Sequence, residues 1–270
     1  MREVSFGQYY PASSFVHKCD PRLKIVFLIA YIVAVFLAKN FYALGACAFV
    51  FLLMAVFSGV PIKSLLRSVK AVLFLLAFTS LLNLFFHRGE TVIWEWWIIK
   101  ISKEAIYFTV FFAVRLFLLV LGSAVLTLTT TPVALTDGIE SLLTPLKWLH
   151  FPVHELALIM SIALRFIPIL TEETARIMNA QKSRGADFES GGLFQRIKAV
   201  LPIIGPLLVS AFRRAEELGD AMDARCYSGG GKRTKYKKLT FTWRDLIALL
   251  LLAVLIAAVV LCGTYFPALV

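Results

Sequence analysis

Two short segments of the chain share one plan that could serve to bind another protein. Ala180 precedes Arg184 and Gly185, and Ala221 precedes Arg225 by the same four positions. Residues four apart lie on one face of a helix, so each alanine would leave clear space beside a projecting guanidinium. A planar guanidinium can bind a carboxylate through two parallel hydrogen bonds. The pattern therefore predicts two docking sites for a partner, each at the end of a helix.

An arginine at a helix end also has a purely local explanation. Its charge complements the helix dipole by roughly 0.3–1 kcal/mol, and alanine followed four positions later by arginine is a frequent chance match. A single copy would favour this explanation. Two copies, each after a long helical pattern with an apolar upstream face, leave the local and the docking explanations both open.

Motifs for metal or nucleotide chemistry are incomplete in this chain. His150 and His154 are four apart, but Pro152 lies between them, and the zinc-protease pattern H-E-x-x-H fails because Leu158 occupies its last position. Gly229–Lys232 lacks the first glycine and the Ser/Thr of a phosphate-binding loop. We therefore predict no catalytic residue, no metal site and no cofactor.

Arg115 is the single charge deep within a long apolar stretch. Charged residues inside membrane helices often mark a transport path, although a lone arginine is more commonly turned into the helix bundle or towards an interface. No acidic residue lies within helical reach of Arg115, so the transport explanation is kept only as an alternative.

Composition places the chain in the membrane. Of its 270 residues, 59% are hydrophobic, above the roughly half that is usual for soluble domains. The net charge of +11 fits basic loops at a bilayer surface better than binding to nucleic acid, because no soluble surface of interleaved basic and aromatic residues is evident. The cysteines lack metal or redox spacing and are expected to be free thiols: Cys19, Cys47, Cys226 and Cys262.

A helix needs about 20 mostly apolar residues to cross a bilayer, and five stretches meet or approach this length. The first of them is short, and only Lys39-Asn40 separates it from the second, so the turn between them must be tight. The predicted spans are Leu23–Ala38, Phe41–Val60, Val69–Phe86, Ala105–Leu128 and Leu246–Phe266.

The spacing of these stretches predicts an all-α integral membrane protein with about five transmembrane helices and a cytoplasmic-facing coupling region of long helices. Residues 1–130 form a membrane part with four spans, residues 131–245 form the coupling region, and residues 246–270 form the last span. The coupling region holds two further apolar runs, at 153–170 and 200–212, which are interrupted by charge or proline. We expect both runs to pack under the membrane part, and their depth in the membrane stays open.

Charge placement orients the protein. With four spans before the coupling region, the basic N-terminal segment, the basic loop after the second span and the coupling region share one side, which the positive-inside tendency makes cytoplasmic. The opposite side carries Trp94, Trp96 and Trp97, as expected for an outer interface. The N-terminus is therefore expected in the cytoplasm of a cell-membrane protein and the C-terminus outside.

Three helices are predicted within the coupling region, from helix starts and stops. Thr131 can cap the first, Pro152 starts the second, and Gly185 supplies the left-handed residue that closes it. Pro202 and Pro206 should kink or interrupt the third. The predicted helices are Val133–Leu149, Pro152–Gly185 and Leu193–Arg225.

Nearly the whole chain resembles the transmembrane T component of energy-coupling-factor (ECF) importers. The resemblance is most specific in the two Ala-Arg segments and also covers shorter motifs before them. The segments that carry it are Cys19–Arg22, Thr130–Pro132, Leu135–Gly138, Ser161–Pro168, Ala180–Phe188 and Ala221–Arg225.

The resemblance implies a non-catalytic subunit for uptake of a vitamin or metal ion. Its partners would be two ATP-binding subunits of the ABC type, a small substrate-binding membrane protein (the S component) and the lipid bilayer. Arg184 and Arg225 would then dock on the two ATP-binding subunits. The other matching motifs imply structural or coupling roles for Asp20, Arg22, Arg165 and Pro168.

The second Ala-Arg segment departs from the family pattern, because Cys226 stands where the family often has glycine. That glycine would end the helix, so the end is expected to shift to Gly229. Two other functions remain as alternatives: the permease of a conventional ABC importer, and a stand-alone channel or secondary transporter, which usually shows repeats or broken membrane helices.

Overall fold

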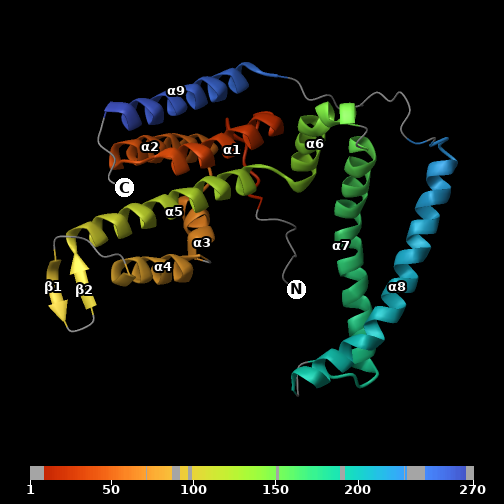
Figure 1. Ribbon diagram of the computed structural model, residues 1–270. Helices are drawn as coiled ribbons and strands as arrows, with labels where there is room; N and C mark the ends of the chain where they lie inside the picture. The colour runs from red at the N-terminus through yellow and green to blue at the C-terminus, as the bar shows by residue number, and fades with distance from the viewer. Residues whose placement is uncertain are drawn as a thin grey trace. The chain divides into compact units, whose positions relative to one another are not determined.

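The computed structural model describes residues 9–70, 72–86, 92–96, 99–149, 152–188, 192–227, 229 and 241–265. The chain divides into two compact units (Figure 1), and each is described by itself. The first unit comprises Met1–Leu142 with Lys238–Val270, and the second comprises Leu143–Lys237.

The first unit holds most of the helices and one short antiparallel strand pair. Its elements are α1 Pro21–Leu37, α2 Phe41–Ser58, α3 Ile62–Lys70, α4 Leu73–Phe86, β1 Val92–Trp96, β2 Ile99–Ser102, α5 Lys103–Thr129, α6 Pro132–Leu143 and α9 Trp243–Tyr265.

Local signals explain where these helices begin and end. The Asp20 carboxylate accepts the Arg22 backbone N–H at the start of α1, and Ser102 Oγ accepts the Ala105 N–H at the start of α5. Thr131 Oγ1 accepts the Ala134 N–H, as predicted for the start of α6. Gly59, at φ +64°, ends α2 in the left-handed conformation that glycine adopts without strain.

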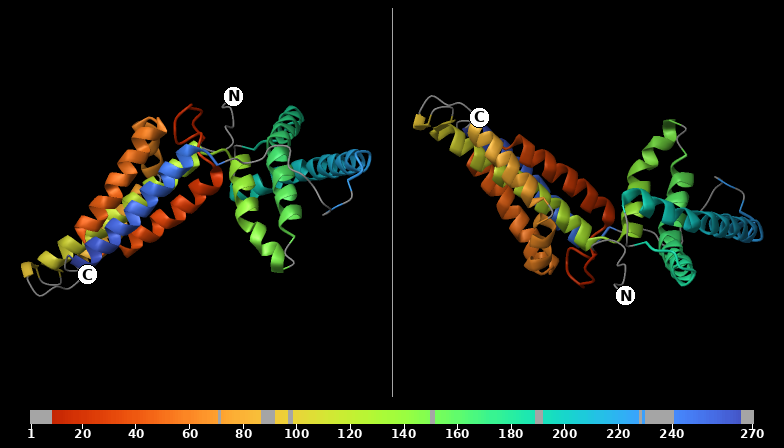
Figure 2. Two further views of the ribbon diagram at one scale, coloured as in Figure 1. Left: turned by 90° about the horizontal axis from the view of Figure 1, so that it is seen from above. Right: turned by 90° about the horizontal axis from the view of Figure 1, so that it is seen from below.

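The long helix α5 is the centre of the first unit, because it packs against α1, α2, α3 and α4. Helix α1 packs in turn against α2 and α9, so α1, α2, α5 and α9 lie side by side (Figure 2). Helices α1 and α5 pack tightly at Gly122, where an added Cβ would lie 2.5 Å from Tyr31 Cε1. Glycine is therefore required there so that the aromatic ring can pack directly on the α5 backbone.

The outward faces of these helices are apolar, which indicates contact with lipid. Side chains such as Phe36, Phe49 and Leu249 are more than half exposed. Within the described residues, α2, α5, α9 and one helix of the second unit, α7 (Val153–Ser183), are long and apolar enough to cross a membrane. The bent pair of α3 and α4 raises the total to five if it counts as one span. The predicted class, an all-α membrane protein with about five spans, is confirmed.

Individual spans differ from the predicted set. The predicted third span is not one helix, because α4 is bent by 59° relative to α3, which carries the basic residues of the preceding loop. Helix α1 has 17 residues and is about 26 Å long at 1.5 Å per residue, shorter than the ~30 Å hydrocarbon core. The strands β1 and β2 were not predicted, since the sequence analysis assigned that segment only to an interfacial loop.

The second unit consists of a 3₁₀ helix, η1 (Thr144–Leu149), and two helices of 31 residues each, α7 and α8 (Leu193–Asp223). Helices α7 and α8 pack against each other, and Arg214 Nη2 of α8 lies 3.5 Å from Glu173 Oε2 of α7. Pro202 and Pro206 lie inside α8, which continues through both, so of the two predicted outcomes, a kink or an interruption, the structure excludes the interruption. Each proline removes one backbone hydrogen bond, and the rest of the long helix retains its own.

Candidate docking site at two helix ends

Helix α7 ends in a Schellman motif, a pair of backbone hydrogen bonds that closes a helix. The Gly185 N–H donates to Lys182 O at 3.0 Å, and the Ala186 N–H donates to Gln181 O at 3.0 Å. Gly185 has φ +90°, and an added Cβ there would meet nothing within 4 Å. The backbone conformation, and not lack of space, therefore favours glycine at this position.

Helix α8 ends in the same Schellman motif, with Cys226 in the position that Gly185 has in α7. The Cys226 N–H donates to Asp223 O at 2.8 Å, and the Tyr227 N–H donates to Met222 O at 3.0 Å. Cys226 itself is left-handed, with φ +56°. The expectation that the helix end shifts to Gly229 is therefore wrong: the cysteine takes the conformation for which glycine is the usual residue.

The two arginines occupy equivalent positions, each directly before the left-handed residue. The Arg184 N–H donates to Gln181 O at 3.0 Å, and the Arg225 N–H donates to Met222 O at 3.1 Å. Both side chains are exposed, as are Ala180 and Ala221 one turn earlier. Among the described residues, neither guanidinium forms an ion pair or donates a hydrogen bond. Each is thus available to an external acceptor, while the closing backbone holds its Cα in place.

The two helix ends lie far from each other. Figure 1 shows the C-terminal end of α7 at the bottom of the view and that of α8 at the upper right. One compact ligand cannot reach both arginines, so docking at the two helix ends would require two separate binding surfaces. The Glu173–Arg214 pair joins the two helices, and because both side chains are partly exposed its contribution is small, about 0–1 kcal/mol.

The remaining predicted site residues lie elsewhere. Arg165 and Pro168 are exposed residues in the middle of α7, and Arg165 is about 28 Å along the helix from Arg184 at 1.5 Å per residue. Asp20 and Arg22 lie together at the start of α1 in the first unit, where Arg22 Nε is 4.0 Å from Asp20 Oδ1. Arg165 and Pro168 therefore lie away from the end of their own helix, and Asp20 and Arg22 belong to the other unit.

The sequence analysis missed a buried polar cluster in the first unit. Asp245, 1% exposed in the first turn of α9, accepts the Asp20 backbone N–H at 2.8 Å and the Thr242 N–H at 2.7 Å. It thus joins residues that are 225 positions apart. The available signal in the sequence is an acidic residue directly before the last apolar stretch, at the predicted boundary of the coupling region.

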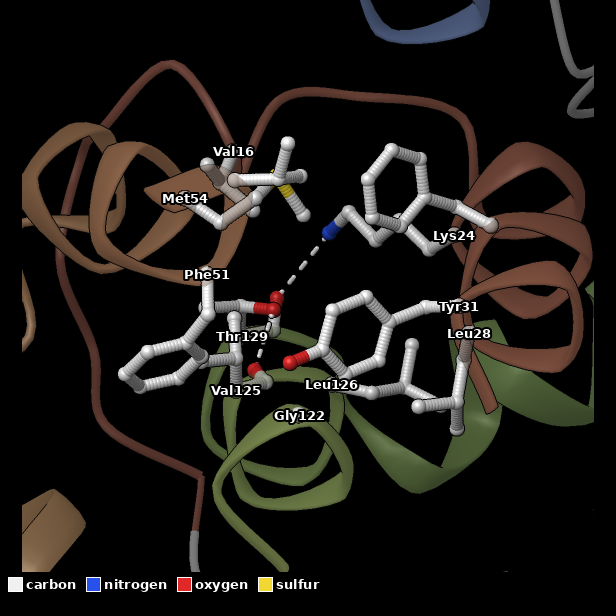
Figure 3. Close-up of a pocket in the computed structure, with 12 residues that line it drawn as sticks. Val16, Lys24, Leu28, Tyr31, Phe51, Met54, Gly122, Val125, Leu126 and Thr129 are labelled. Atoms are coloured by element: carbon white, nitrogen blue, oxygen red, sulfur yellow. Dashed lines mark hydrogen bonds between the residues drawn. The ribbon is translucent and has the colours of Figure 1, made fainter. Parts of the chain in front are cut away.

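Lys24 forms the second half of this cluster. It is 7% exposed, and its ammonium donates to Thr129 O at 3.1 Å and to His17 O at 3.3 Å. Figure 3 shows the lysine nitrogen directed across the space between α1 and α5 towards Thr129, with Tyr31 beside it. Helix α1 is therefore joined to the C-terminal end of α5, where the helix dipole favours a positive charge.

Arg115 joins the opposite end of α1. Its guanidinium donates to the backbone oxygen of Ala38, the residue after the last turn of α1, and lies 4.6 Å from the centre of the Phe111 ring. The arginine is turned into the bundle, which was the explanation favoured from the sequence. Polar contacts therefore fix α1 at both ends.

Some residues singled out from the sequence lie outside the described residues. They are Trp97, His150 and Gly230–Lys232.

The sequence of this chain is similar to a known protein family and to several named relatives. Residues 12–236 match the model of the CbiQ family, described as cobalt transport protein. The chain is 45% identical over 247 residues to the energy-coupling factor transporter transmembrane protein EcfT of Ruminiclostridium cellulolyticum, which covers 92% of each chain. It is 42% identical over 259 residues to the protein of that name from Bacillus subtilis, covering 95% of this chain and 98% of that one.

Proposed function

The chain belongs to the CbiQ family and is the transmembrane T component of an energy-coupling factor transporter, and we propose that it transmits motion through the ends of α7 and α8. It is a non-catalytic coupling subunit. The observation that carries the proposal is the equivalence of the two helix ends, each with an exposed arginine and no partner among the described residues.

The proposed partners are two ATP-binding subunits of the ABC type and a small substrate-binding membrane protein. Because the two arginines are well separated, two partner subunits with one docking surface each fit them better than a single docking surface does. In such a surface a carboxylate would pair with both N–H groups of the guanidinium fork. Truncating one partner of a buried charge pair costs about 2–5 kcal/mol, so each arginine would contribute strongly to the complex.

The mechanism follows from the length of the helices. When ATP brings the two ATP-binding subunits together, the ends of α7 and α8 would move with them. A continuous helix of 31 residues is about 46 Å long and transmits displacement along its axis. The membrane part would then shift against the substrate-binding protein, which carries the vitamin or metal ion. Asp20, Arg22, Arg165 and Pro168 are proposed to support this coupling.

The proposed domain roles and orientation rest on charge and sequence. Residues 1–130 and 246–270 would form the membrane part and residues 131–245 the coupling region, with the N-terminus cytoplasmic and the C-terminus outside. The basic coupling region supports a cytoplasmic position for both helix ends, where ATP-binding subunits would meet them.

Purification from native membranes tests the partner set. An affinity tag on this chain should recover two ATP-binding subunits together with a small membrane protein. Recovery of ATP-binding subunits alone would point to a conventional importer permease, and recovery of neither would contradict the proposed partners.

A further inference from the structure

The first unit contains an apolar groove that the docking sites do not use. The cavity, of about 330 Å³, lies between the segment before α1 and the helices α1, α2 and α9. Its size is within the range of about 300–1,000 Å³ that is usual for small-molecule sites. Apolar side chains line it, including Leu23, Phe27, Leu53, Phe57, Ile247 and Leu251.

Lys24 also borders the groove but does not make it polar. Its ammonium is engaged with the Thr129 and His17 backbone oxygens, so its methylene chain is what the groove meets. The interior therefore offers no charged partner for a ligand and suits a hydrocarbon chain.

A cation is held at one end of this groove. The Arg244 guanidinium lies 5.9 Å from the centre of the Phe15 ring and 5.8 Å from that of Trp243, both of which line the groove. Within the described residues no carboxylate pairs with Arg244, because the adjacent Asp245 accepts two backbone N–H groups. The cation is positioned by aromatic rings and has no counter-ion among the described residues.

The groove is thus amphipathic along its length. Trp243 and Arg244 occupy the first turn of α9, and the apolar lining continues to Leu251, about 12 Å along the helix. Tryptophan and arginine favour the level of lipid headgroups, and the apolar part lies where acyl chains lie. In the sequence, residues 232–238 add five Lys/Arg directly before this helix, which favours anionic over zwitterionic lipids.

We propose that this groove binds one anionic phospholipid, with its phosphate at Arg244 and one acyl chain along α9 between Ile247 and Leu251. The bound chain would fill the space between α2, α9 and the segment that leads into α1.

Quenching of Trp243 fluorescence by brominated phospholipids tests the proposal on the full chain. The other tryptophans, at 94, 96, 97 and 148, are replaced by phenylalanine, and the protein is reconstituted in phosphatidylcholine vesicles. A small fraction of either brominated phosphatidylglycerol or brominated phosphatidylcholine is then included. We expect phosphatidylglycerol to quench with an apparent affinity at least about fivefold higher, since one cation at a headgroup alone has this effect.

Three variants locate the lipid. Arg244→Gln should lower the preference for phosphatidylglycerol about fivefold, and the part of the preference that comes from the basic residues at 232–238 should remain. Ala248→Phe, which fills the groove, should reduce quenching by both lipids. Leu250→Phe, at a position 59% exposed and outside the groove, is the matched control and should leave quenching unchanged. Circular dichroism and gel filtration confirm that each variant is folded.

The outcomes separate a specific site from ordinary surrounding lipid. Quenching in proportion to mole fraction, equal for the two lipids, would overturn the proposal. A preference for phosphatidylglycerol that is as strong in Arg244→Gln as in the parent would overturn the headgroup position. Absence of quenching by either lipid would show that no lipid occupies the groove, and this result would also overturn the proposal.

Discussion

Cys226 bears a conformational cost that Gly185, its counterpart at the other helix end, does not. A left-handed backbone costs a residue with a Cβ about 1–2 kcal/mol, and Cys226 has φ +56°. The sequence identified both arginines, because their spacing from alanine is visible in it. It could not predict that the cysteine would keep the glycine conformation, because the backbone strain at Cys226 competes with two local hydrogen bonds, to Met222 O and Asp223 O, and the sequence does not show which of them prevails.

Replacing Cys226 by glycine should stabilise the end of α8 by about 1 kcal/mol, because the strain is removed while both closing hydrogen bonds remain. Replacing Gly185 by alanine should destabilise the end of α7 by a similar amount. Hydrogen exchange at the Tyr227 and Ala186 amides measures each effect locally. Equal exchange rates in the variants and the parent would contradict the assigned conformations.

Asp245 should contribute to the thermal stability of the first unit. Asp245→Ala would leave the buried Asp20 N–H without its acceptor, at a cost of about 1–3 kcal/mol. Asp245→Asn keeps one carbonyl acceptor and should lose less. Thermal unfolding of the purified chain ranks the three proteins, and an alanine variant as stable as the asparagine variant would argue against these hydrogen bonds.

At the scale of elements, the apolar stretches predicted the helices well because a lipid-facing helix must be apolar along its whole length. Breaks within such stretches were harder to predict. The bend between α3 and α4 depends on how α3 packs: Leu65 and Val69 are buried while its basic residues face outward. Likewise, the sequence shows the prolines of α8 but not that the surrounding helix tolerates them.

Gly122→Ala tests the contact between α1 and α5. Its Cβ would lie 2.5 and 2.8 Å from two atoms of the Tyr31 ring, so the helices must move apart, and we expect destabilisation of about 1–3 kcal/mol.

Gly45→Ala on α2 is the matched control, because a Cβ there meets nothing within 4 Å. It should be neutral or slightly stabilising, since alanine favours the helix over glycine by up to about 1 kcal/mol. Thermal unfolding in detergent compares the two, and similar melting temperatures for both variants would contradict the close packing at Gly122.

At the scale of the whole molecule, polar contacts join α1 to α5 and α9 in the first unit. The second unit carries its two arginines at the ends of long helices. This division suits a protein that passes motion from one set of partners to another. The polar contacts at Lys24 and Asp245 could not be predicted, because each depends on segments that are distant in sequence.

Cys226 provides a native reporter of orientation and docking, since it is the exposed one of the four cysteines and follows Arg225 directly. Burial raises the pKa of the Cys19 thiol, which keeps it in the less reactive protonated form. A membrane-impermeant maleimide should label Cys226 only from the cytoplasmic side, and bound ATP-binding subunits should protect it. Cys226→Ser is the control for labelling at other thiols, and labelling from outside would contradict the proposed orientation.

Uptake by reconstituted vesicles tests the docking of both helix ends most directly. The Arg184→Ala, Arg225→Ala double variant is compared with Arg176→Ala, Arg213→Ala, which removes two exposed arginines from the same helices away from their ends. We expect the first pair to lose the ATP-binding subunits on purification and to slow substrate uptake at least about thirtyfold, which corresponds to about 2 kcal/mol, the lower end of the cost of losing one buried charge pair. The control pair should retain both. Full uptake and normal co-purification with Arg184 and Arg225 both replaced would contradict the account.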